Sequence, residues 1–233
     1  MDNFKRVVKQ IPVIGVAARA VRVSYKKATF PGSRDYWEQN YANGGNSGEG
    51  SYGVYAEFKA EVLNKFVAEH QVQSVIEFGC GDGNQLSLAT YPTYIGLDVS
   101  TTAIQLCMNR FQGDKTKSFY LYDPDRFVDN ARLFHADIAL SMEVIFHLIE
   151  DEVFDQYMRF LSAAADRYLI IFSSNTDETP VLEAAHYKNR KFSTWIDAHL
   201  PDWTLLETVP NRYPYDPKTK TGFTSQFYIY GKP

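Results

Sequence analysis

Short apolar runs alternate with amphipathic segments along the chain from Ser74 onward. The runs predict seven strands, at 74–79, 94–98, 118–122, 136–142, 168–173, 204–208 and 226–230. Nearly uniform apolar strands separated by helices are typical of a parallel sheet with helices on both faces. The last strand follows a loop-rich connection, which allows an antiparallel edge. We therefore predict a doubly wound, mostly parallel α/β sheet of seven strands with an antiparallel last strand.

Apolar residues at helical spacing mark the helices of the predicted fold. Helices are expected at 54–69, 83–89, 101–111, 151–165, 181–185 and 193–198, with a short one at 35–41. Ser100 is placed to cap the helix that starts at Thr101. The sequence contains no internal repeat. We therefore predict one domain over residues 31–233, which begins with a Gly- and Tyr-rich lid segment at 31–53 and follows an extension at 1–30.

The composition indicates a folded protein without a metal or a disulfide framework. Of the 233 residues, 45% are apolar and 22% are charged, which is enough apolar material for a packed core. The two cysteines, Cys80 and Cys107, and the five histidines show no metal-ligand spacing. So few cysteines are typical of a reducing compartment. We expect a cytoplasmic protein.

Charge is distributed unevenly along the chain. Residues 1–30 contain seven Lys or Arg and one Asp, whereas the remainder has 17 basic and 27 acidic side chains, a net charge of −10. The acidic remainder predicts no nucleic-acid partner. The apolar run 11–18 in the basic arm is far shorter than the ~20 residues of a membrane span. Residues 1–30 are interpreted either as a peripheral contact to the inner face of the membrane or as an extension without that role.

A glycine-rich turn follows the first predicted strand, in the sequence Val75-Ile-Glu-Phe-Gly-Cys-Gly-Asp-Gly83. Glycines permit a tight turn and a close approach of a ligand to the backbone. Asp98, nineteen residues after Gly79, ends the second strand. Adjacent strand ends lie side by side in a doubly wound sheet. Asp98 is therefore placed to accept hydrogen bonds from the ribose of a nucleoside over the glycine loop.

Two classes of nucleoside ligand are compatible with this pattern. The first is a dinucleotide, which would make the protein an NAD(P)-dependent oxidoreductase. A dinucleotide loop has the spacing G-x-G-x-x-G, whereas Asn84 takes the third glycine position here, so this class is kept only as the alternative. The spacing E-x-G-x-G-x-G from Glu77 to Gly83 instead resembles the first motif of the class I, Rossmann-like S-adenosylmethionine (SAM)-dependent methyltransferases. Residues 137–148 are similar to that family's fourth-strand motif and 169–174 to its fifth strand. The resemblance covers about residues 54–174.

The resemblance implies SAM as the cofactor and S-adenosylhomocysteine (SAH) as its product. The residues expected to contact the cofactor are Glu77, Gly79, Cys80, Gly81 and Gly83 in the loop, Asp98 after the second strand, Asp123 after the third, Ser141, Met142 and Glu143 at the fourth, and Tyr36 and Tyr41 in the lid segment. The loop would hold the methionine end, Asp98 the ribose and Asp123 the adenine. Asp123 is equally well explained as a turn residue before Pro124, and Met142 as a packing residue.

Methyl transfer to a hydroxyl oxygen benefits from a base near the acceptor. The resemblance makes His147, just after the fourth strand, the first choice for this base, and His186 is the second. Each is equally well interpreted as a histidine without a catalytic role. The basic segment 186–191 suggests that His186, Arg190 and Lys191 bind the acceptor, together with Tyr52 of the lid segment. A guanidinium such as that of Arg190 is suited to an anionic group.

Within the lid segment, the stretch from Asp35 to Gly53 resembles a motif of bacterial methyltransferases associated with surface-polysaccharide biosynthesis. This resemblance implies transfer to an oxygen of a small or glycan-type acceptor, either a sugar hydroxyl or a phosphate. A non-catalytic, SAM-binding scaffold protein is a further alternative. The sequence leaves open the identity of the acceptor, oxygen or nitrogen as the methylated atom, and the oligomeric state.

Overall fold

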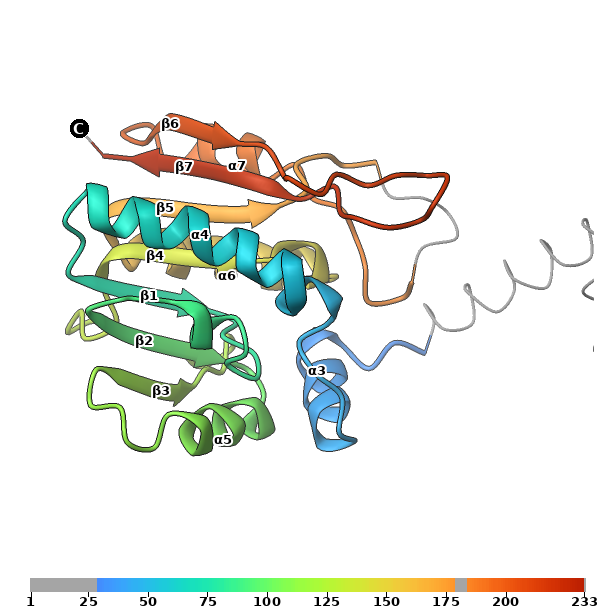
Figure 1. Ribbon diagram of the computed structural model, residues 1–233, viewed down its shortest axis with the longest axis horizontal. Helices are drawn as coiled ribbons and strands as arrows, with labels where there is room; N and C mark the ends of the chain where they lie inside the picture. The colour runs from blue at the N-terminus through green and yellow to red at the C-terminus, as the bar shows by residue number, and fades with distance from the viewer. Residues whose placement is uncertain (1–28, 179–183, 233) are drawn as a thin grey trace, which may run out of the picture.

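The computed structural model describes residues 29–178 and 184–232, in which seven strands form one sheet in the order β3-β2-β1-β4-β5-β7-β6 (Figure 1). The strands are β1 (Ser74–Phe78), β2 (Thr93–Asp98), β3 (Lys117–Leu121), β4 (Ala136–Met142), β5 (Ala165–Ser173), β6 (Thr204–Val209) and β7 (Gln226–Gly231). Strands β1 to β5 run parallel, and β7 is antiparallel to both β5 and β6. The predicted fold class is therefore confirmed.

Helices cover both faces of this sheet. They are α3 (Ser33–Ala42), α4 (Gly53–Glu69), α5 (Thr101–Arg110), α6 (Asp151–Ala163) and α7 (Phe192–His199), with the short 3₁₀ helices η1 (Glu49–Ser51), η2 (Leu86–Leu88) and η3 (Ile145–His147). Helix α4 crosses one face, α6 and α7 lie behind the other, and α3 stands at the edge where the parallel strands end (Figure 1).

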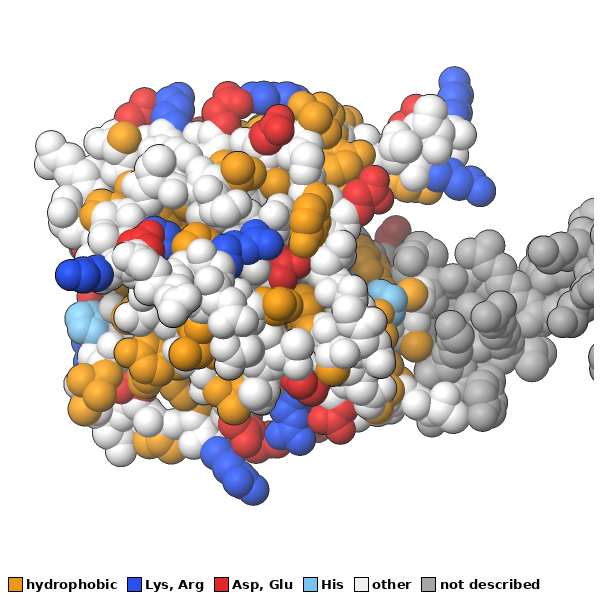
Figure 2. Space-filling model, turned by 60° about the horizontal axis from the view of Figure 1, so that its bottom comes forward, with side chains coloured by type: hydrophobic (Ala, Val, Ile, Leu, Met, Phe, Trp, Pro, Cys, Tyr) orange, Lys and Arg blue, Asp and Glu red, His pale blue; other side chains and the backbone are white. Residues whose placement is uncertain are grey.

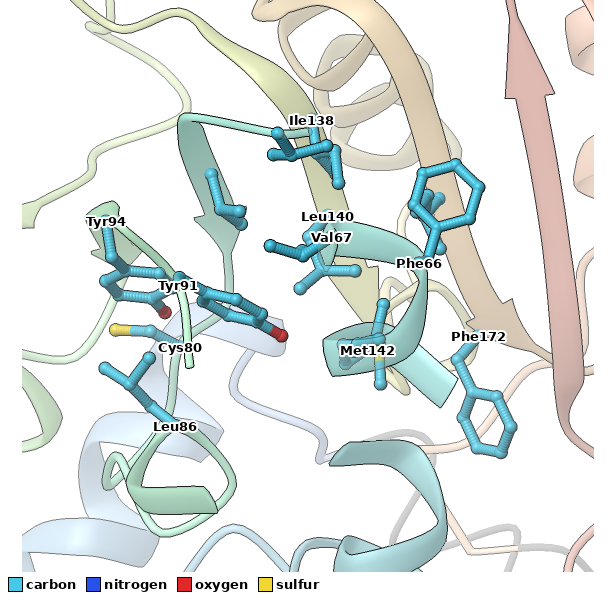
Figure 3. Close-up of a cluster of buried hydrophobic side chains, with 14 of the residues drawn as sticks. Phe66, Val67, Cys80, Leu86, Tyr91, Tyr94, Ile138, Leu140, Met142 and Phe172 are labelled. Atoms are coloured by element: carbon cyan, nitrogen blue, oxygen red, sulfur yellow. The ribbon is translucent and has the colours of Figure 1, made fainter. Parts of the chain in front are cut away.

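Each face of the sheet has its own hydrophobic core, because neighbouring side chains of a strand point to opposite faces. In β1, Val75 belongs to one core and Ile76 to the other. Figure 3 shows the first core, in which Phe66 of α4 shares a cluster with Ile138 and Leu140 of β4. Burial of each such side chain contributes about 1.5–3 kcal/mol. The two cores thus hold the strand ends in fixed positions.

The helix predicted at 83–89 is wrong, because only the three-residue η2 forms there. Gly83 has φ +73°, which a right-handed helix cannot contain. The side chains of Asn84 and Gln85 donate hydrogen bonds of 2.8 and 3.0 Å to carbonyl groups of the lid segment and of α4. The connection from β1 to β2 is therefore held by other segments and not by its own helical turns.

The remaining local expectations have mixed outcomes. Ser100 caps α5, since its Oγ accepts a hydrogen bond of 3.0 Å from the N–H of Ala103, and residues 35–41 fall within α3. Of the helix expected at 181–185, residues 181–183 lie outside the described ones, and the next two are not helical. The basic arm lies almost entirely in residues 1–28, also outside the described part. Among the residues that the structure describes, no helix has both the length and the apolar character to cross a membrane.

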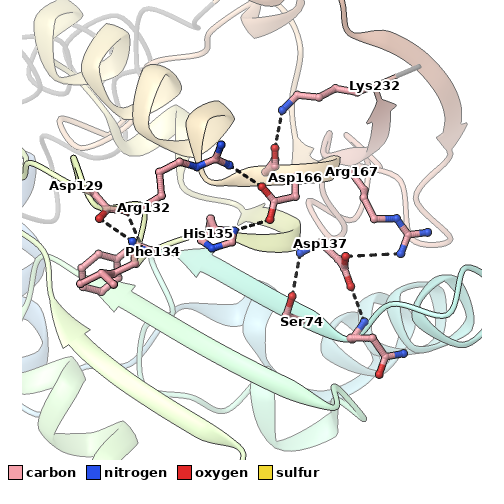
Figure 4. A network of polar contacts seen from close by, with 12 residues as sticks. Ser74, Asp129, Arg132, Phe134, His135, Asp137, Asp166, Arg167 and Lys232 are labelled. Atoms are coloured by element: carbon pink, nitrogen blue, oxygen red, sulfur yellow. Dashed lines mark hydrogen bonds and ion pairs between the residues drawn. The ribbon is translucent and has the colours of Figure 1, made fainter.

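A polar network ties together the amino ends of the central strands (Figure 4). The N–H of Asp137 donates to Ser74 Oγ at 2.9 Å, which links β4 to β1. His135 and Arg132 both contact the carboxylate of Asp166 in β5. His135 therefore has a structural role at the opposite end of the strands from the glycine loop.

Candidate active site

A cavity of about 600 Å³ lies at the carboxyl ends of β1, β2 and β4, where ligands of open α/β sheets bind. The lid segment covers it, with α3 and the turn at 46–51 both among its walls. The predicted site residues that line this cavity are Tyr36, Tyr41, Glu77, Gly79, Cys80, Gly81, Asp98, Met142, Glu143, His147 and His186. Residues from five separate parts of the chain thus meet in one place.

The glycine loop makes a sharp turn after β1, with φ of +88° at Gly79 and +58° at Gly81. Such values favour glycine. A Cβ at Gly81 would lie 2.3 Å from Ser47 Oγ, and a Cβ at Gly79 would lie 2.5 Å from a methyl group of Val144. Glycine is therefore needed at these positions because the lid segment and the chain after β4 pack directly against the loop. The sequence had indicated only the approach of a ligand.

Asp98 is held rigidly beside the glycine loop. Its two carboxylate oxygens accept hydrogen bonds of 2.9 Å each from the backbone N–H groups of Gly81 and Ser100. Burial raises the pKa of Asp98 to about 6, because water is largely excluded from the carboxylate. Each oxygen keeps a further lone pair, so the side chain can still accept hydrogen bonds from a diol in the cavity.

Glu77 places a second buried carboxylate under the cavity. Only 5% of the residue is exposed, and Tyr94 donates a hydrogen bond of 2.6 Å to it. Burial raises the pKa of Glu77 to about 7. A cationic ligand would favour the ionised form of Glu77, because an opposite charge offsets part of the desolvation cost.

The lid segment is fastened to the glycine loop through Asp82. The carboxylate of Asp82 accepts hydrogen bonds from Tyr52 at 2.6 Å and from the N–H of Ser47 at 3.0 Å. The N–H of Asp82 in turn donates to Ser47 Oγ at 2.9 Å. Tyr52 does not belong to the cavity wall. The structure therefore gives Tyr52 an anchoring contact, and its predicted contact to the acceptor has no geometric support.

Two further contacts fasten α3 to other strand ends. Glu38 accepts hydrogen bonds from Ser100 Oγ and Thr102 Oγ1 at the start of α5 (2.7 and 2.6 Å). Ser33 Oγ donates to Glu150 at 2.6 Å, just after η3. The lid segment is thus connected to the ends of β1, β2 and β4 at once, which encloses the cavity. These pairs are far apart in sequence, and no local pattern indicates them.

Aromatic rings of α3 pack on the two histidines. Tyr36 stacks on His186 with ring centres 4.5 Å apart, and Trp37 meets the ring of His147 edge-on at 4.9 Å. The rings of His147 and His186 are themselves stacked at 5.5 Å. The structure therefore brings the two predicted histidines together and packs Trp37 of the lid segment against one of them.

His147 is held in one orientation. Its Nδ1 lies 2.8 Å from the carbonyl oxygen of His186, which can only accept, so Nδ1 carries the proton. Burial lowers the pKa of His147 to about 4. The ring is therefore neutral near pH 7, and its Nε2 has a free lone pair for a hydrogen bond. A pKa this low makes it a weak general base.

A buried ion pair lies beside the same end of the cavity. Lys59 of α4, 1% exposed, places its Nζ 2.8 Å from Glu143 Oε2. Glu143 lines the cavity and has φ +59°, an uncommon value for a residue with a side chain. Lys59 was not among the predicted site residues, because a single lysine in an amphipathic helix is ordinarily solvent-exposed.

The sequence and the structure were compared with those of known proteins. None of the protein-family models matches the sequence. A curated small RNA 2'-O-methyltransferase from Arabidopsis thaliana is 29% identical over 137 residues, which are 54% of this chain and only 14% of the plant protein. Among solved structures, N-methyltransferase NodS from Bradyrhizobium japonicum WM9, in complex with SAH, has a TM-score of 0.64 at 16% identity, over 86% of this chain and 98% of NodS.

Two more solved methyltransferase structures are similar to this chain in fold. The methyltransferase domain of bacterial CtHen1-C has a TM-score of 0.57 at 17% identity, covering 76% of this chain and 97% of that domain. Magnesium protoporphyrin IX methyltransferase (ChlM) from Synechocystis PCC 6803, with bound SAH, has a TM-score of 0.58 at 16% identity, over 91% and 99%. The chain has the class I SAM-dependent methyltransferase fold. NodS and ChlM were crystallised with SAH, consistent with the predicted cofactor.

The cavity walls are compatible with the cofactor of this methyltransferase fold. SAM carries a positive sulfonium, an ammonium group, a carboxylate and a ribose diol, and all of these except the carboxylate are suited by hydrogen-bond acceptors and negative charge. Glu77, Asp98 and Glu143 supply these on three neighbouring strand ends. Arg34 is the one lysine or arginine among the described cavity residues, and it contacts the carboxylates of Asp35 and Asp123.

Several of the predicted site residues do not line the cavity. Gly83, Asp123, Ser141, Arg190 and Lys191 are not part of its walls. Asp123 accepts the N–H of Asp125 at 3.1 Å, the turn role that was the alternative. Ser141 is fully buried and accepts a hydrogen bond of 2.7 Å from Tyr157.

Of the basic segment after β5, His186 lines the cavity, but Lys188, Arg190 and Lys191 do not. Arg190 is buried, and its guanidinium donates to the carbonyl oxygens of Leu148 and Ile149 at 2.7 and 2.9 Å and contacts Asp151. Lys188 pairs with the same Asp151 at 2.6 Å. The geometry therefore gives Arg190 a structural role and provides no support for the expectation that Arg190 binds an anionic group of the acceptor.

Proposed function

We propose that this chain is a SAM-dependent methyltransferase that transfers a methyl group to an oxygen of its acceptor. The observation that carries the proposal is the buried Asp98 carboxylate, fixed against the positive-φ glycine loop inside a lid-covered cavity. The curated relative is named as a 2'-O-methyltransferase, which supports oxygen as the methylated atom. NodS is an N-methyltransferase, so nitrogen is the alternative.

The connection after β1 argues against the dinucleotide alternative. A dinucleotide site needs a helix N-terminus to hold the pyrophosphate. Here the glycine loop leads into a 3₁₀ turn of three residues, and Gly83 interrupts any helix before it. The acid-rich cavity walls would also repel a pyrophosphate, whereas they attract a cation.

In this proposal Asp98 binds the ribose diol and Glu77 the ammonium group, while the lid segment excludes water. When bound, SAM would supply an electrophilic methyl carbon, to which the acceptor oxygen would form a bond as the carbon–sulfur bond breaks. The electron pair of that bond would stay on sulfur, and the hydroxyl proton would pass to a carboxylate of the cavity wall. His147, neutral and oriented by the carbonyl of His186, accepts through Nε2 a hydrogen bond from a second hydroxyl of the acceptor, beside the one that is methylated. Its main contribution is to orient the acceptor, since its pKa is too low for efficient proton removal.

The acceptor of the proposed reaction is a hydroxyl group on a glycan-type or small molecule. The lid segment's resemblance to methyltransferases of surface-polysaccharide biosynthesis supports this class. An RNA hydroxyl is the second candidate, favoured by the curated relative. Against RNA, residues 31–233 have a net charge of −10, and on the face in Figure 2 blue side chains are scattered among red and orange ones.

An acceptor screen with labelled SAM tests the proposal. Calorimetry with SAH and with NAD⁺ first identifies the cofactor, and methyl transfer is then scored on nucleotide sugars, glycan termini and short RNA. Label on a sugar hydroxyl would support the proposal, and label on RNA would support the second candidate. SAH binding without transfer to any acceptor would favour the non-catalytic scaffold, and binding of NAD⁺ in place of SAH would refute the proposal.

A further inference from the structure

The buried ion pair between Lys59 and Glu143 is costly for the fold. Their side chains are only 2% and 12% exposed, and Lys59 Nζ also lies 5.4 Å from the centre of the Phe172 ring. Removing two charges from water carries a large desolvation cost, which their attraction only partly offsets. Such a pair is a weak stabilising device, and an apolar pair could fill the same space. Its presence therefore suggests a role in the cavity.

The backbone at Glu143 gives a second, independent indication. Its φ of +59° is in the left-handed region, which is strained for a residue other than glycine and is concentrated at functional sites. The N–H of Glu143 is held by the carbonyl of Phe172 at 2.7 Å. A Cβ at Gly50 would lie 2.2 Å from Glu143 Oε2, so the lid segment closes directly over this carboxylate.

The sheet order locates Glu143 relative to the cofactor. Strand β1 lies between β2, which ends in Asp98, and β4, which leads into Glu143. If the ribose lies at Asp98 and the methionine end over the glycine loop, the sulfur lies over β1, and Glu143 is on the side away from the ribose. This placement rests on the proposed function.

We propose that Glu143, positioned by Lys59, faces the reacting methyl group and accepts a hydrogen bond from the nucleophile of the acceptor. Lys59 binds Oε2, and within the described residues Oε1 accepts no hydrogen bond, so this oxygen is available to the cavity. A desolvated carboxylate attracts a hydroxyl or an amine and repels a phosphate or carboxylate oxygen. The acceptor class is therefore one whose nucleophilic atom carries a proton, which removes phosphate from the acceptors expected from the sequence.

Binding of two cofactor analogues tests this inference without knowledge of the acceptor. SAH has no group at the methyl position, whereas sinefungin carries an amine there. Calorimetry on the wild-type protein should show that sinefungin binds at least about tenfold more tightly than SAH, because its ammonium meets the carboxylate. Glu143→Gln should abolish this preference and leave SAH affinity within about threefold. In that variant Lys59 takes the amide oxygen, and the amide NH₂ faces the ligand.

Three further variants separate the positioning role of Lys59 from a simple effect of charge. Glu49→Gln removes an exposed carboxylate that also lines the cavity, and it should leave the preference for sinefungin unchanged. Lys59→Met should reduce the preference, and Lys59→Arg should restore it at least in part, which a purely structural lysine would not do. Thermal unfolding of each variant confirms that it is folded.

The outcomes distinguish this inference from the proposed function. If the wild-type protein binds SAH but Glu143→Gln keeps the full preference for sinefungin, the inference is refuted and the methyltransferase proposal stands. If neither ligand binds the wild-type protein, the proposed function fails, and the inference fails with it.

Discussion

Glu38 is expected to control how fast the cofactor leaves the cavity. Its carboxylate accepts three hydrogen bonds at the start of α5, from Ser100 Oγ at 2.7 Å, Thr102 Oγ1 at 2.6 Å and the N–H of Thr102 at 3.2 Å. The side-chain hydrogen bonds from Thr102 and Ser100 lower the pKa of Glu38. A carboxylate at a helix N-terminus also interacts favourably with the helix dipole. Glu38 thus holds α3 next to Asp98 without lining the cavity itself.

The magnitude follows from these contacts. A hydrogen bond to a charged group contributes about 1.5–3 kcal/mol when it is shielded from water. Glu38 is only half-buried, so we take about 1–2 kcal/mol for the three contacts together. This free energy corresponds to about a 5- to 30-fold change in the equilibrium between the closed and open lid segment.

We expect Glu38→Ala to weaken SAH binding about 5- to 30-fold, mainly through faster dissociation. Calorimetry measures the affinity, stopped-flow displacement measures the dissociation rate, and hydrogen exchange of α3 reports on opening. Glu61→Ala is the matched control, because this exposed glutamate pairs with Arg212 on the surface at 2.8 Å and should have no effect. An unchanged dissociation rate in a folded Glu38→Ala protein would show that the lid segment closes without this contact.

Three further predictions concern the loop, pH and the basic segment. Gly81→Ala should lower SAH affinity at least about tenfold, as seen by calorimetry, because the new Cβ meets Ser47 and the positive φ becomes strained; normal affinity would show that the lid segment adapts. The raised pKa values of Glu77 (about 7) and Asp98 (about 6) mean that the folded state binds protons more tightly than the unfolded state. Their contribution to the stability of the ligand-free protein is therefore greatest at low pH and declines between about pH 4 and 7, which urea unfolding at a series of pH values checks. Glu77→Gln should flatten this decline. An unchanged dependence of stability on pH in this variant would contradict the raised pKa of Glu77. Arg190→Met should lower the free energy of unfolding by about 1–3 kcal/mol and leave SAH affinity unchanged, because it removes the hydrogen-bond donor of two carbonyl groups. A variant of normal stability that binds the acceptor more weakly would instead support binding of the acceptor by Arg190.

The sequence by itself determined the sheet and the position of its main acid. Strands are short apolar runs that can be recognised from a few neighbouring residues. Because adjacent strand ends lie side by side in a doubly wound sheet, Asp98 could be placed beside the glycine loop. The structure has both features. The motif spacing also favoured a SAM loop over a dinucleotide site. The structure adds a physical reason, because only a three-residue 3₁₀ helix follows Gly83.

Only the tertiary structure decided which polar side chains meet. Lys59 reaches Glu143 across 84 positions, and Glu38 reaches Thr102 across 64, so no local pattern could indicate either pair. Arg190 looked like a surface cation, yet it turns inward to backbone carbonyl groups left at the end of η3. Hydrophobic periodicity specifies which face of an element is buried, whereas the partner of a charged side chain depends on where the elements come to rest against one another.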